Sequence, residues 1–485
     1  MKNHTHPATV IRLTIYLFIG LLLLGGTGLV LGLLFVFRVD TSPIAIRVPV
    51  ERSKVVAPYV PVVGELTLGD GVSSPLLMSP MSVNWSQFRG ENRDAISPAT
   101  ISLKKHWTTD APPLVQWGLP LGEGFAGAAV RNGRVYILDY DEANQRDALR
   151  CLSFDNGKEI WRFSYPVKIK KNHGFSRTIP AVTDQYCVTL GPKCHVLCVD
   201  ALTGEEKWLI DLRHEYGTTE PDWYAGQCPL IVMLPNNNKP STIIAPAGPE
   251  ALMVALDCET GEEVWRTPNP FGWQMTHASI APMELDGQLT FVYFGGDGLA
   301  GVGAVDGEIL WSTPTGWRPG MASCPSPVIL PENRIFCCGG YNVGSIMLQV
   351  TSNPPGKYRA NTLFRLEHPV FDSEQQTPIY YAGHIFGLRQ FDKQFVCLDL
   401  NGKIVWTSGR TEKFGSGPFL VADEMILILD DDGKLTGCEA TPSGYRKLFE
   451  VEDMLDGSAC WAPLAIVDGR LLLRDQYFLK CIDLR

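Results

Sequence analysis

A short pattern of apolar and polar residues recurs along the chain after residue 113. Each copy has an apolar run, a polar turn with glycine, and a second apolar run that ends in tryptophan. The clearest copies are LRCLSFDNGKEIW, LCVDALTGEEKW, MVALDCETGEEVW, AGVGAVDGEILW and VCLDLNGKIVW, ending at Trp161, Trp208, Trp265, Trp311 and Trp406. Because glycine accepts the positive φ of tight turns, each copy predicts a β-hairpin.

The distance from turn to tryptophan is constant in these five copies. A glycine stands four residues before each tryptophan, at Gly157, Gly204, Gly261, Gly307 and Gly402. Side chains alternate between the two faces of a strand, so a fixed distance keeps the indole on one face. We therefore expect every indole to meet an equivalent partner surface.

Weaker copies extend the series to eight aromatic markers. Trp117, Phe364 and Phe449 join the five tryptophans, with spacings of 42 to 57 residues. Two further apolar runs lie between markers, such as GAAVRNG and RVYILDY before the turn at Gly157. Four short strands in each repeat are typical of a propeller blade, whereas a two-layer sandwich has no such long period.

The two ends of the repeat region complement each other. After Phe449 the chain has three predicted strands, WAPLAIVDG, RLLLRDQ and YFLKCIDLR, while the strand at Trp117 has no hairpin partner. Pairing these ends in one mixed blade removes exposed sheet edges. We therefore predict an all-β fold, an eight-bladed β-propeller over residues 113–485 whose ends close in one mixed blade.

The N-terminal part of the chain has a different texture. Residues 13–37 contain 25 residues without a charge, enough for a helix to cross a hydrocarbon layer of roughly 30 Å. We predict a short tail over residues 1–12 and a transmembrane helix over 13–37, with a cleaved signal peptide as the alternative. A proline-containing stalk over 38–84, extended or lying against the folded part, and a leading segment over 85–112 would follow.

Charge and cysteine content narrow the chemistry. The net charge of −10 argues against a nucleic-acid partner. Thirteen cysteines without a C-x-x-C pair exclude a regular disulfide framework or zinc ribbon. Five cysteines occupy what reads as one equivalent slot of the repeat, which predicts burial: Cys151, Cys198, Cys397, Cys438 and Cys481. The disulfide state of Cys187 and Cys194, and of the adjacent Cys337 and Cys338, stays open.

These repeats resemble the quinoprotein-type (PQQ-like) β-propeller repeat. The stretch NWSQFRGENRDAIS at residues 84–97 is similar to the W-x-Q-F-R-G-x-N-R-D-G segment that precedes such propellers in many extracytoplasmic bacterial proteins, with Ala95 in place of the usual glycine. The resemblance covers about 400 of the 485 residues. It implies the fold but not the activity, because the family includes both quinone-dependent dehydrogenases and non-catalytic scaffolds such as BamB.

The dehydrogenases of this family imply a cofactor site that this sequence does not match. They place the quinone against a tryptophan and a disulfide between adjacent cysteines, and they hold Ca²⁺ through Glu, Asn and Asp. No such set aligns here, and Asp430, Asp431 and Asp432 read as a polar turn. The chain also lacks H-E-x-x-H, G-x-S-x-G and Walker motifs. We predict no catalytic residue, no metal ligand and no cofactor.

A propeller gathers its inner strands and the loops before them at the axis, where any binding funnel would form. The funnel candidates are polar and aromatic residues of these loops: His173, Ser176, Arg177, Trp223, Tyr224, Gln227, His277, Ser279, Gln376 and Trp461. Arg177 and His277 stand out because a charged or titratable group near the axis needs a partner. The alternative is that all of these side chains only fill the central channel.

The expected function is that of a non-enzymatic binding or scaffold protein for envelope proteins or polymers. We expect a single pass through the inner (cytoplasmic) membrane with the bulk on the periplasmic side, although basic residues on both flanks of the span leave the orientation to the resemblance. The alternative is an oxidoreductase that uses pyrroloquinoline quinone (PQQ) with Ca²⁺.

Overall fold

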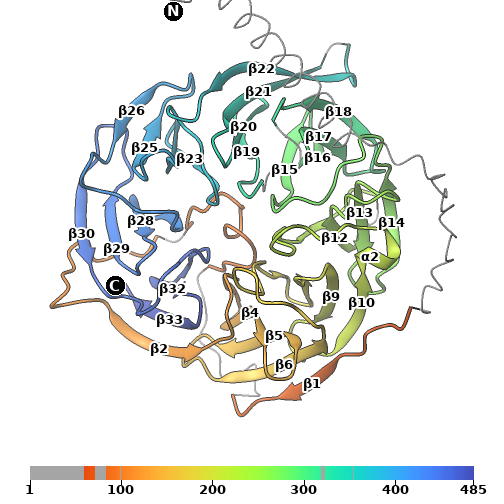
Figure 1. Cartoon of the computed structure of the whole chain (residues 1–485), viewed down its shortest axis with the longest axis horizontal. Helices are drawn as coiled ribbons and strands as arrows, with labels where there is room; N and C mark the ends of the chain where they lie inside the picture. Colours follow the sequence, from red (N-terminus) through yellow and green to blue (C-terminus); the bar gives the residue numbers. More distant parts are fainter. Residues whose placement is uncertain (1–58, 72–82, 99, 237, 318–322, 353) are drawn as a thin grey trace, which may run out of the picture. The chain divides into compact units, whose positions relative to one another are not determined.

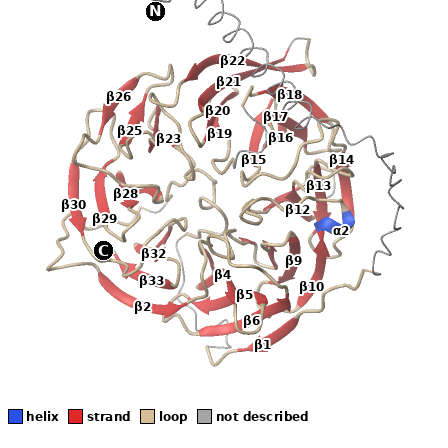
Figure 2. Ribbon diagram, viewed as in Figure 1, coloured by secondary structure: helices blue, strands red, loops and turns tan. Residues whose placement is uncertain are grey.

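The computed structural model describes residues 59–71, 83–98, 100–236, 238–317, 323–352 and 354–485. All elements of these ranges belong to the compact unit Pro61–Arg485. Eight antiparallel sheets in this unit surround a common centre (Figure 1). Figure 2 shows strands around the ring and loops meeting at its middle. The prediction of an all-β, eight-bladed propeller is confirmed.

Each blade is a meander of four strands ordered from the centre outward. Blades 1 to 4 consist of β3 (Ala129–Arg131), β4 (Arg134–Asp141), β5 (Arg146–Ser153) and β6 (Glu159–Pro166); β7 (Ala181–Val182), β8 (Tyr186–Leu190), β9 (His195–Asp200) and β10 (Glu206–Asp211); β11 (Leu230–Met233), β12 (Pro240–Ile244), β13 (Met253–Asp257) and β14 (Glu263–Thr267); and β15 (Ala281–Leu285), β16 (Gln288–Gly295), β17 (Gly298–Gly303) and β18 (Ile309–Pro314). Blades 5 to 7 consist of β19 (Val328–Leu330), β20 (Arg334–Gly339), β21 (Gly344–Ser352) and β22 (Tyr358–Leu366); β23 (Ile379–Tyr381), β24 (His384–Leu388), β25 (Phe395–Leu398) and β26 (Ile404–Thr407); and β27 (Phe419–Ala422), β28 (Met425–Leu429), β29 (Leu435–Glu439) and β30 (Lys447–Val451).

Blade 8 joins the two ends of the propeller. It contains β31 (Ala465–Val467), β32 (Arg470–Arg474), β33 (Phe478–Asp483) and, outermost, β2 (Leu114–Pro120). Trp117 of β2 lies opposite Cys481 of β33 in an antiparallel pair. The predicted closure by one mixed blade is confirmed.

A further strand comes from the region predicted as a stalk. β1 (Glu65–Leu68) pairs antiparallel with the outer strand β6 of blade 1, so that this sheet has five strands. The short helix α2 (Leu212–Glu215) follows β10. In the described ranges, helices are too short and too polar to cross a membrane. The predicted tail over 1–12 and transmembrane helix over 13–37 lie outside those ranges.

The repeated glycine and tryptophan link neighbouring blades. A Cβ atom on Gly157, Gly204, Gly261, Gly307 or Gly402 would lie 2.6 to 2.8 Å from an aromatic ring of the preceding blade. Those rings belong, in order, to Trp117, Trp161, Trp208, Trp265 and Phe364. All five glycines have φ between +70° and +81°. The constant spacing therefore serves contacts between hairpins, because each of these five aromatics docks on the next turn and not on its own.

Most of these indoles also donate a hydrogen bond to the neighbouring blade. Trp117 Nε1 donates to the Phe154 carbonyl at 2.8 Å, and Trp208 Nε1 donates to the Cys258 carbonyl at 3.0 Å. Trp311 is the exception, since its Nε1 is buried without a partner in the described ranges. The next hairpin, between the nine-residue strands β21 and β22, is longer, and a Cβ atom on its turn glycine, Gly356, would meet no other atom within 4 Å.

The cysteine slot is the same in four blades and shifted in one. Cys151, Cys198, Cys397 and Cys481 lie directly opposite the marker aromatic of their blade. The prediction is wrong for Cys438, because Gly437 lies opposite Phe449 and a β-bulge follows it. All thirteen cysteines are free thiols, and all but Cys324 are buried, including Cys187, Cys194, Cys337 and Cys338.

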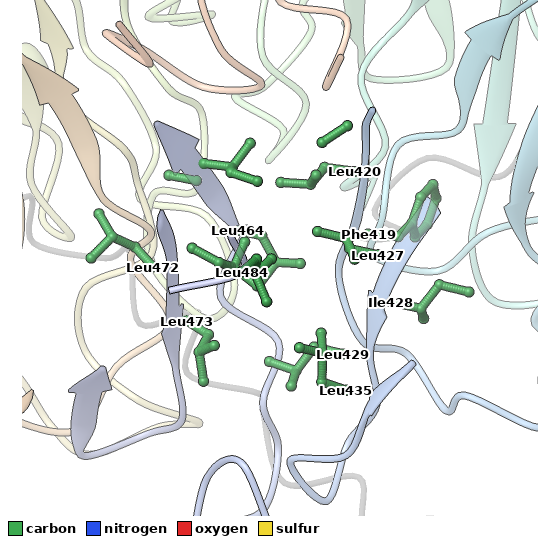
Figure 3. Packing of buried hydrophobic residues seen from close by; sticks show 14 of the residues in the cluster. Phe419, Leu420, Leu427, Ile428, Leu429, Leu435, Leu464, Leu472, Leu473 and Leu484 are labelled. Carbon is green, nitrogen blue, oxygen red and sulfur yellow. The ribbon is translucent and has the colours of Figure 1, made fainter. Parts of the chain in front are cut away.

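The core consists of apolar side chains packed between adjacent sheets. Figure 3 shows Leu427 and Leu429 of blade 7 together with Leu472 and Leu473 of blade 8. Each of these side chains is at most 2% exposed. Because sheet faces cover each other around the ring, both faces of strands such as β8 and β28 are buried.

Candidate functional site

The leading segment crosses the middle of the propeller. The Trp85 amide donates to the Val130 carbonyl of blade 1 at 2.9 Å, and the Ser97 amide donates to the Val421 carbonyl of blade 7 at 2.8 Å. Figure 1 shows this segment passing through the centre of the ring. The segment over residues 84–97, which suggested the family, therefore lies across the axis and bonds to blades 1 and 7.

Two arginines of the leading segment bind the inner edges of the blades. Arg89 donates to the Thr377 carbonyl at 2.7 Å and to the Pro378 carbonyl at 2.9 Å, and Arg93 donates to the Pro229 carbonyl at 2.9 Å. Burial lowers the pKa of both guanidinium groups to about 10, so both stay charged at neutral pH. Their bonds tie blades 3 and 6 to one segment.

A pocket of about 330 Å³ lies at the axis, and we call it the axial pocket. It is lined by Phe88 of the leading segment and by loops from the blades: Phe125, His173, Arg177, Trp223, Gly226, Cys228, His277, Ser279, Cys324, Tyr341, Gln375, Gln376, Thr377, Trp461 and Pro463. The structure thus brings together seven of the ten funnel candidates: His173, Arg177, Trp223, His277, Ser279, Gln376 and Trp461.

Three funnel candidates lie outside this lining. Ser176 is buried and donates to Asp147 Oδ1 at 3.2 Å. The Tyr224 hydroxyl donates to the Lys170 carbonyl. The Gln227 amide is fully buried and accepts a hydrogen bond from the Ala245 amide at 2.9 Å. All three side chains therefore hold loops in place.

The lining follows a positional rule that sequence reasoning missed. One residue of each blade precedes the first residue of the inner strand by four positions: Phe125, Arg177, Gly226, His277, Cys324, Gln375, Gly415 and Trp461. All of them except Gly415 line the axial pocket. We call these positions the upper ring. This spacing can be found in the sequence only if the first residue of every inner strand is known. Such a prediction is difficult for a strand as short as β7, which has only two residues.

A second ring, two residues further along, is structural. The amides of Ile179, Cys228, Ser279 and Ser326 each donate to a side chain of the next blade, at Cys228 Sγ, Ser279 Oγ, Ser326 Oγ and Thr377 Oγ1. The donor–acceptor distances are 3.3 Å for the sulfur and 2.9 Å for the three hydroxyls. We call these positions the lower ring. These bonds link the loops of neighbouring blades at the axis.

Arg177 supplies the charge of the upper ring. Its Nη2 donates to the carbonyls of Asn172 at 3.1 Å and His173 at 2.8 Å, its Nε donates to the Trp223 carbonyl, and its guanidinium carbon lies 5.7 Å from the Phe125 ring centre. Burial lowers its pKa to about 10. The group therefore remains a cation at neutral pH in a largely apolar setting.

His277 lies beside this cation and is neutral. Burial, followed by the charge of Arg177, lowers the pKa of His277 to about 4. Its Nδ1 atom is buried and has no hydrogen-bond partner in the part of the chain that the structure describes. Gly226 makes room for this ring, since a Cβ atom there would lie 2.6 Å from His277 Cδ2.

Aromatic rings form the walls of the pocket. Trp223 and Tyr341 are nearly parallel, with ring centres 6.4 Å apart and an interplanar angle of 7°. Phe125 stacks on Trp461 with ring centres 5.2 Å apart. The Trp461 indole is held by a 2.7 Å hydrogen bond from Nε1 to Asp431 Oδ1. Such surfaces bind flat apolar groups, while Arg177 and His277 offer polar contacts.

The axial pocket does not fit a quinone held by Ca²⁺. Its described lining contains no Asp or Glu, although Ca²⁺ prefers several carboxylate and carbonyl oxygens. Cys337 and Cys338 are buried in β20 and do not line it. Asp430 Oδ1 accepts hydrogen bonds from the amides of Asp432 and Lys434, as a polar turn requires. The described residues include no group of three or more His, Cys, Asp or Glu placed to hold a metal ion.

Comparison with known proteins gives the same architecture. A family model described as "Outer membrane protein assembly factor BamB" matches residues 104–220 and 238–349. The quinoprotein alcohol dehydrogenase PedH of Pseudomonas putida strain KT2440 is 29% identical over 178 residues, which are 34% of this chain and 28% of that protein. The aligned part thus spans little more than a quarter of that relative.

Solved structures are similar in fold at low identity. The crystal structure of BamB from Moraxella catarrhalis aligns with a TM-score of 0.52 and 12% identity, covering 76% of this chain and 99% of that one. A europium-containing methanol dehydrogenase aligns with a TM-score of 0.45 and 12% identity, covering 81% of this chain and 89% of that one. The chain belongs to the PQQ-like (quinoprotein-type) β-propeller repeat family, in which it is similar to BamB-like propellers.

Proposed function

We propose that this protein is a membrane-anchored, extracytoplasmic β-propeller that binds envelope proteins or polymers without catalysing a reaction. The observation that carries the proposal is the match to the family described as an outer membrane assembly factor. The helix over 13–37 would anchor the protein by a single pass in the inner membrane, with the propeller in the periplasm. No cofactor is part of this proposal.

Hydrogen bonds within the protein hold several polar groups of the axial pocket in place, which supports a binding role. Ser279 and Thr377 use their hydroxyls as acceptors in the lower ring, and Gln376 donates to the Ser416 and Trp461 carbonyls at 3.2 Å each. Groups fixed in this way hold the shape of the pocket. Preorganised walls favour binding, because little conformational entropy is lost when a ligand enters.

The test is site-specific crosslinking in intact membranes. A photoreactive phenylalanine derivative replaces Tyr341, which is 37% exposed at the pocket, or Leu363, which is 46% exposed on the outer strand β22. We expect one envelope component to be captured reproducibly at position 341. An excess of the protein without the photoreactive residue should compete for that component and reduce its capture. Capture at position 363 alone would place the contact on the outer edge. No reproducible capture at either position would contradict a binding role.

The side of the membrane needs its own measurement. Protease added to spheroplasts should degrade the propeller if it lies in the periplasm, while a cytoplasmic marker protein stays intact. Protection of the propeller until the membrane is opened with detergent would overturn the proposed localisation.

The identity with PedH favours a second candidate, a PQQ-dependent oxidoreductase. Purified protein is incubated with PQQ and Ca²⁺, and the measurements are cofactor absorbance after gel filtration and dye-linked oxidation of alcohols and sugars. Because the pocket lining offers no carboxylate for the metal, we expect neither signal. Retained quinone together with dye reduction would establish the oxidoreductase instead.

A further inference from the structure

Arg177 is a half-buried cation without an anionic partner in the described ranges. Its Nε and Nη2 atoms donate only to backbone carbonyls, and no ion pair joins it to a carboxylate in the described ranges. Arg474 near the axis lies close to Asp139 and Asp475, which favour its charge. Arg93 donates to the Gln87 side chain and to backbone carbonyls, but it does not line the axial pocket. Transfer of a charge out of water is costly unless a counter-charge or hydrogen bonds compensate. Arg177 has the hydrogen bonds but lacks the counter-charge.

The axial pocket gives a ligand access to this cation. Arg177 is part of the lining, and Nη1 has no hydrogen-bond partner in the described ranges. The neutral imidazole of His277 stands beside it, and its unpartnered Nδ1 leaves one further polar contact. No Asp or Glu in the described lining competes for the guanidinium. An entering anion therefore meets one uncompensated positive charge.

The aromatic rings that line the pocket indicate which chemical group should accompany the anion in a ligand. Trp223 and Tyr341 present parallel rings, and Phe125 lies under the guanidinium. A ligand that is anionic throughout would leave these apolar surfaces uncovered, whereas a neutral apolar ligand would leave the cation unpaired. A single carboxylate on a flat apolar body satisfies both, since guanidinium groups bind carboxylates through two parallel N–H groups and rings stack on rings.

We propose that the axial pocket binds a carboxylate attached to an aromatic or apolar body, with the carboxylate on Arg177 and the body between the aromatic walls. The inference goes beyond the proposed function, because it holds whether or not the propeller binds a larger partner. It also needs no metal ion. The same chemistry is present in a free aromatic acid and in the C-terminus of a peptide that ends in an aromatic residue.

The experiment compares acids with their neutral amides by isothermal titration calorimetry on the full chain in a non-ionic detergent. One arm uses phenylacetate and phenylacetamide. The other uses the peptide acetyl-Gly-Gly-Phe with a free or an amidated C-terminus. We expect each preferred acid to bind at least roughly tenfold more tightly than its amide, as the loss of a charge-assisted pair requires. Binding in the first arm identifies a free acid as sufficient, and binding in the second arm alone identifies a peptide terminus.

Variants assign the effect to one side chain. Arg177→Met should remove the preference for acid over amide, and Arg177→Lys, which keeps the charge, should retain part of it. Arg162→Met on the outer strand β6, where Arg162 pairs with Glu159, is the matched control and should change neither affinity. If the methionine variant does not fold, the comparison of acids with amides on the unmodified chain still decides. Equal affinity of acids and amides, or no acid binding at millimolar concentration, would overturn the proposal, while capture of a partner by crosslinking would be unaffected.

Discussion

Replacement of Gly261 by alanine tests whether the repeated glycine serves the contact between blades. Gly261 has φ +74°, and a Cβ atom there would lie 2.8 to 3.1 Å from three atoms of the Trp208 indole. An alanine in this backbone conformation costs about 1 kcal/mol. Displacing a packed ring costs about 2 kcal/mol more, and weakening the 3.0 Å bond from Trp208 Nε1 to the Cys258 carbonyl adds about 1 kcal/mol.

Gly383 provides the matched control, because it has φ +79° in the hairpin between β23 and β24, and a Cβ atom there would meet no other atom within 4 Å. Gly383→Ala therefore carries the backbone strain but no clash. We expect Gly261→Ala to lower the free energy of unfolding by about 3 kcal/mol more than Gly383→Ala. Urea unfolding followed by circular dichroism measures both. Equal losses would show that glycine is needed for its φ alone and would refute the docking explanation.

Three further predictions concern the repeat, the buried acid and the leading segment. Trp265→Phe removes a 3.1 Å hydrogen bond from Nε1 to the Ala304 carbonyl, whereas Trp311→Phe removes none. The free energy of unfolding, measured by urea titration, should therefore fall by about 1 kcal/mol more for Trp265→Phe. Burial raises the pKa of Asp147 to about 7, so its native state keeps a proton that the unfolded chain releases near pH 4; stability from this group should fall as pH rises from about 4 to 7. Unfolding midpoints across this range should flatten in Asp147→Asn, and an unchanged slope would contradict the assignment. Arg89→Lys cannot reach all the carbonyls that the guanidinium binds, so limited proteolysis within residues 85–97 should become faster, and an unchanged rate would argue against its anchoring role.

The fold was predictable because the repeat encodes the same contact between glycine and aromatic ring in five of the eight blades. Turn glycines and marker aromatics have fixed chemical requirements, a positive φ and a flat apolar partner, and both are visible in the sequence. The strand at Trp117 has no hairpin partner and the last repeat lacks its fourth strand, so pairing the two in one blade was the natural way to close the ring. Cys438 was misplaced because the residue opposite the marker is set by a bulge, and the position of a bulge depends on hydrogen bonding across strands.

Seven of the ten funnel candidates line the axial pocket, and the three that do not lie within one or two residues of an upper-ring position. Ser176 precedes the upper-ring residue Arg177 by one position, and Tyr224 and Gln227 flank the upper-ring residue Gly226. A shift of one residue in an extended segment turns the side chain to the other face. The loops before inner strands differ in length and conformation, with positive φ at Trp223 and Tyr224, so the residue that faces the axis can be assigned only when the start of each inner strand is known.

The separation between the two rings explains how one fold can host different chemistry. The lower ring and the arginines of the leading segment fix the backbone at the axis through hydrogen bonds that do not involve the upper-ring side chains of Phe125, His277 or Trp461. Upper-ring residues are therefore free to differ between blades without loss of the architecture. In this chain they combine one cation with aromatic, amide and thiol groups and no acid. A site of that composition favours an anion over a metal ion, and this is the basis of the proposal that Arg177 binds a carboxylate.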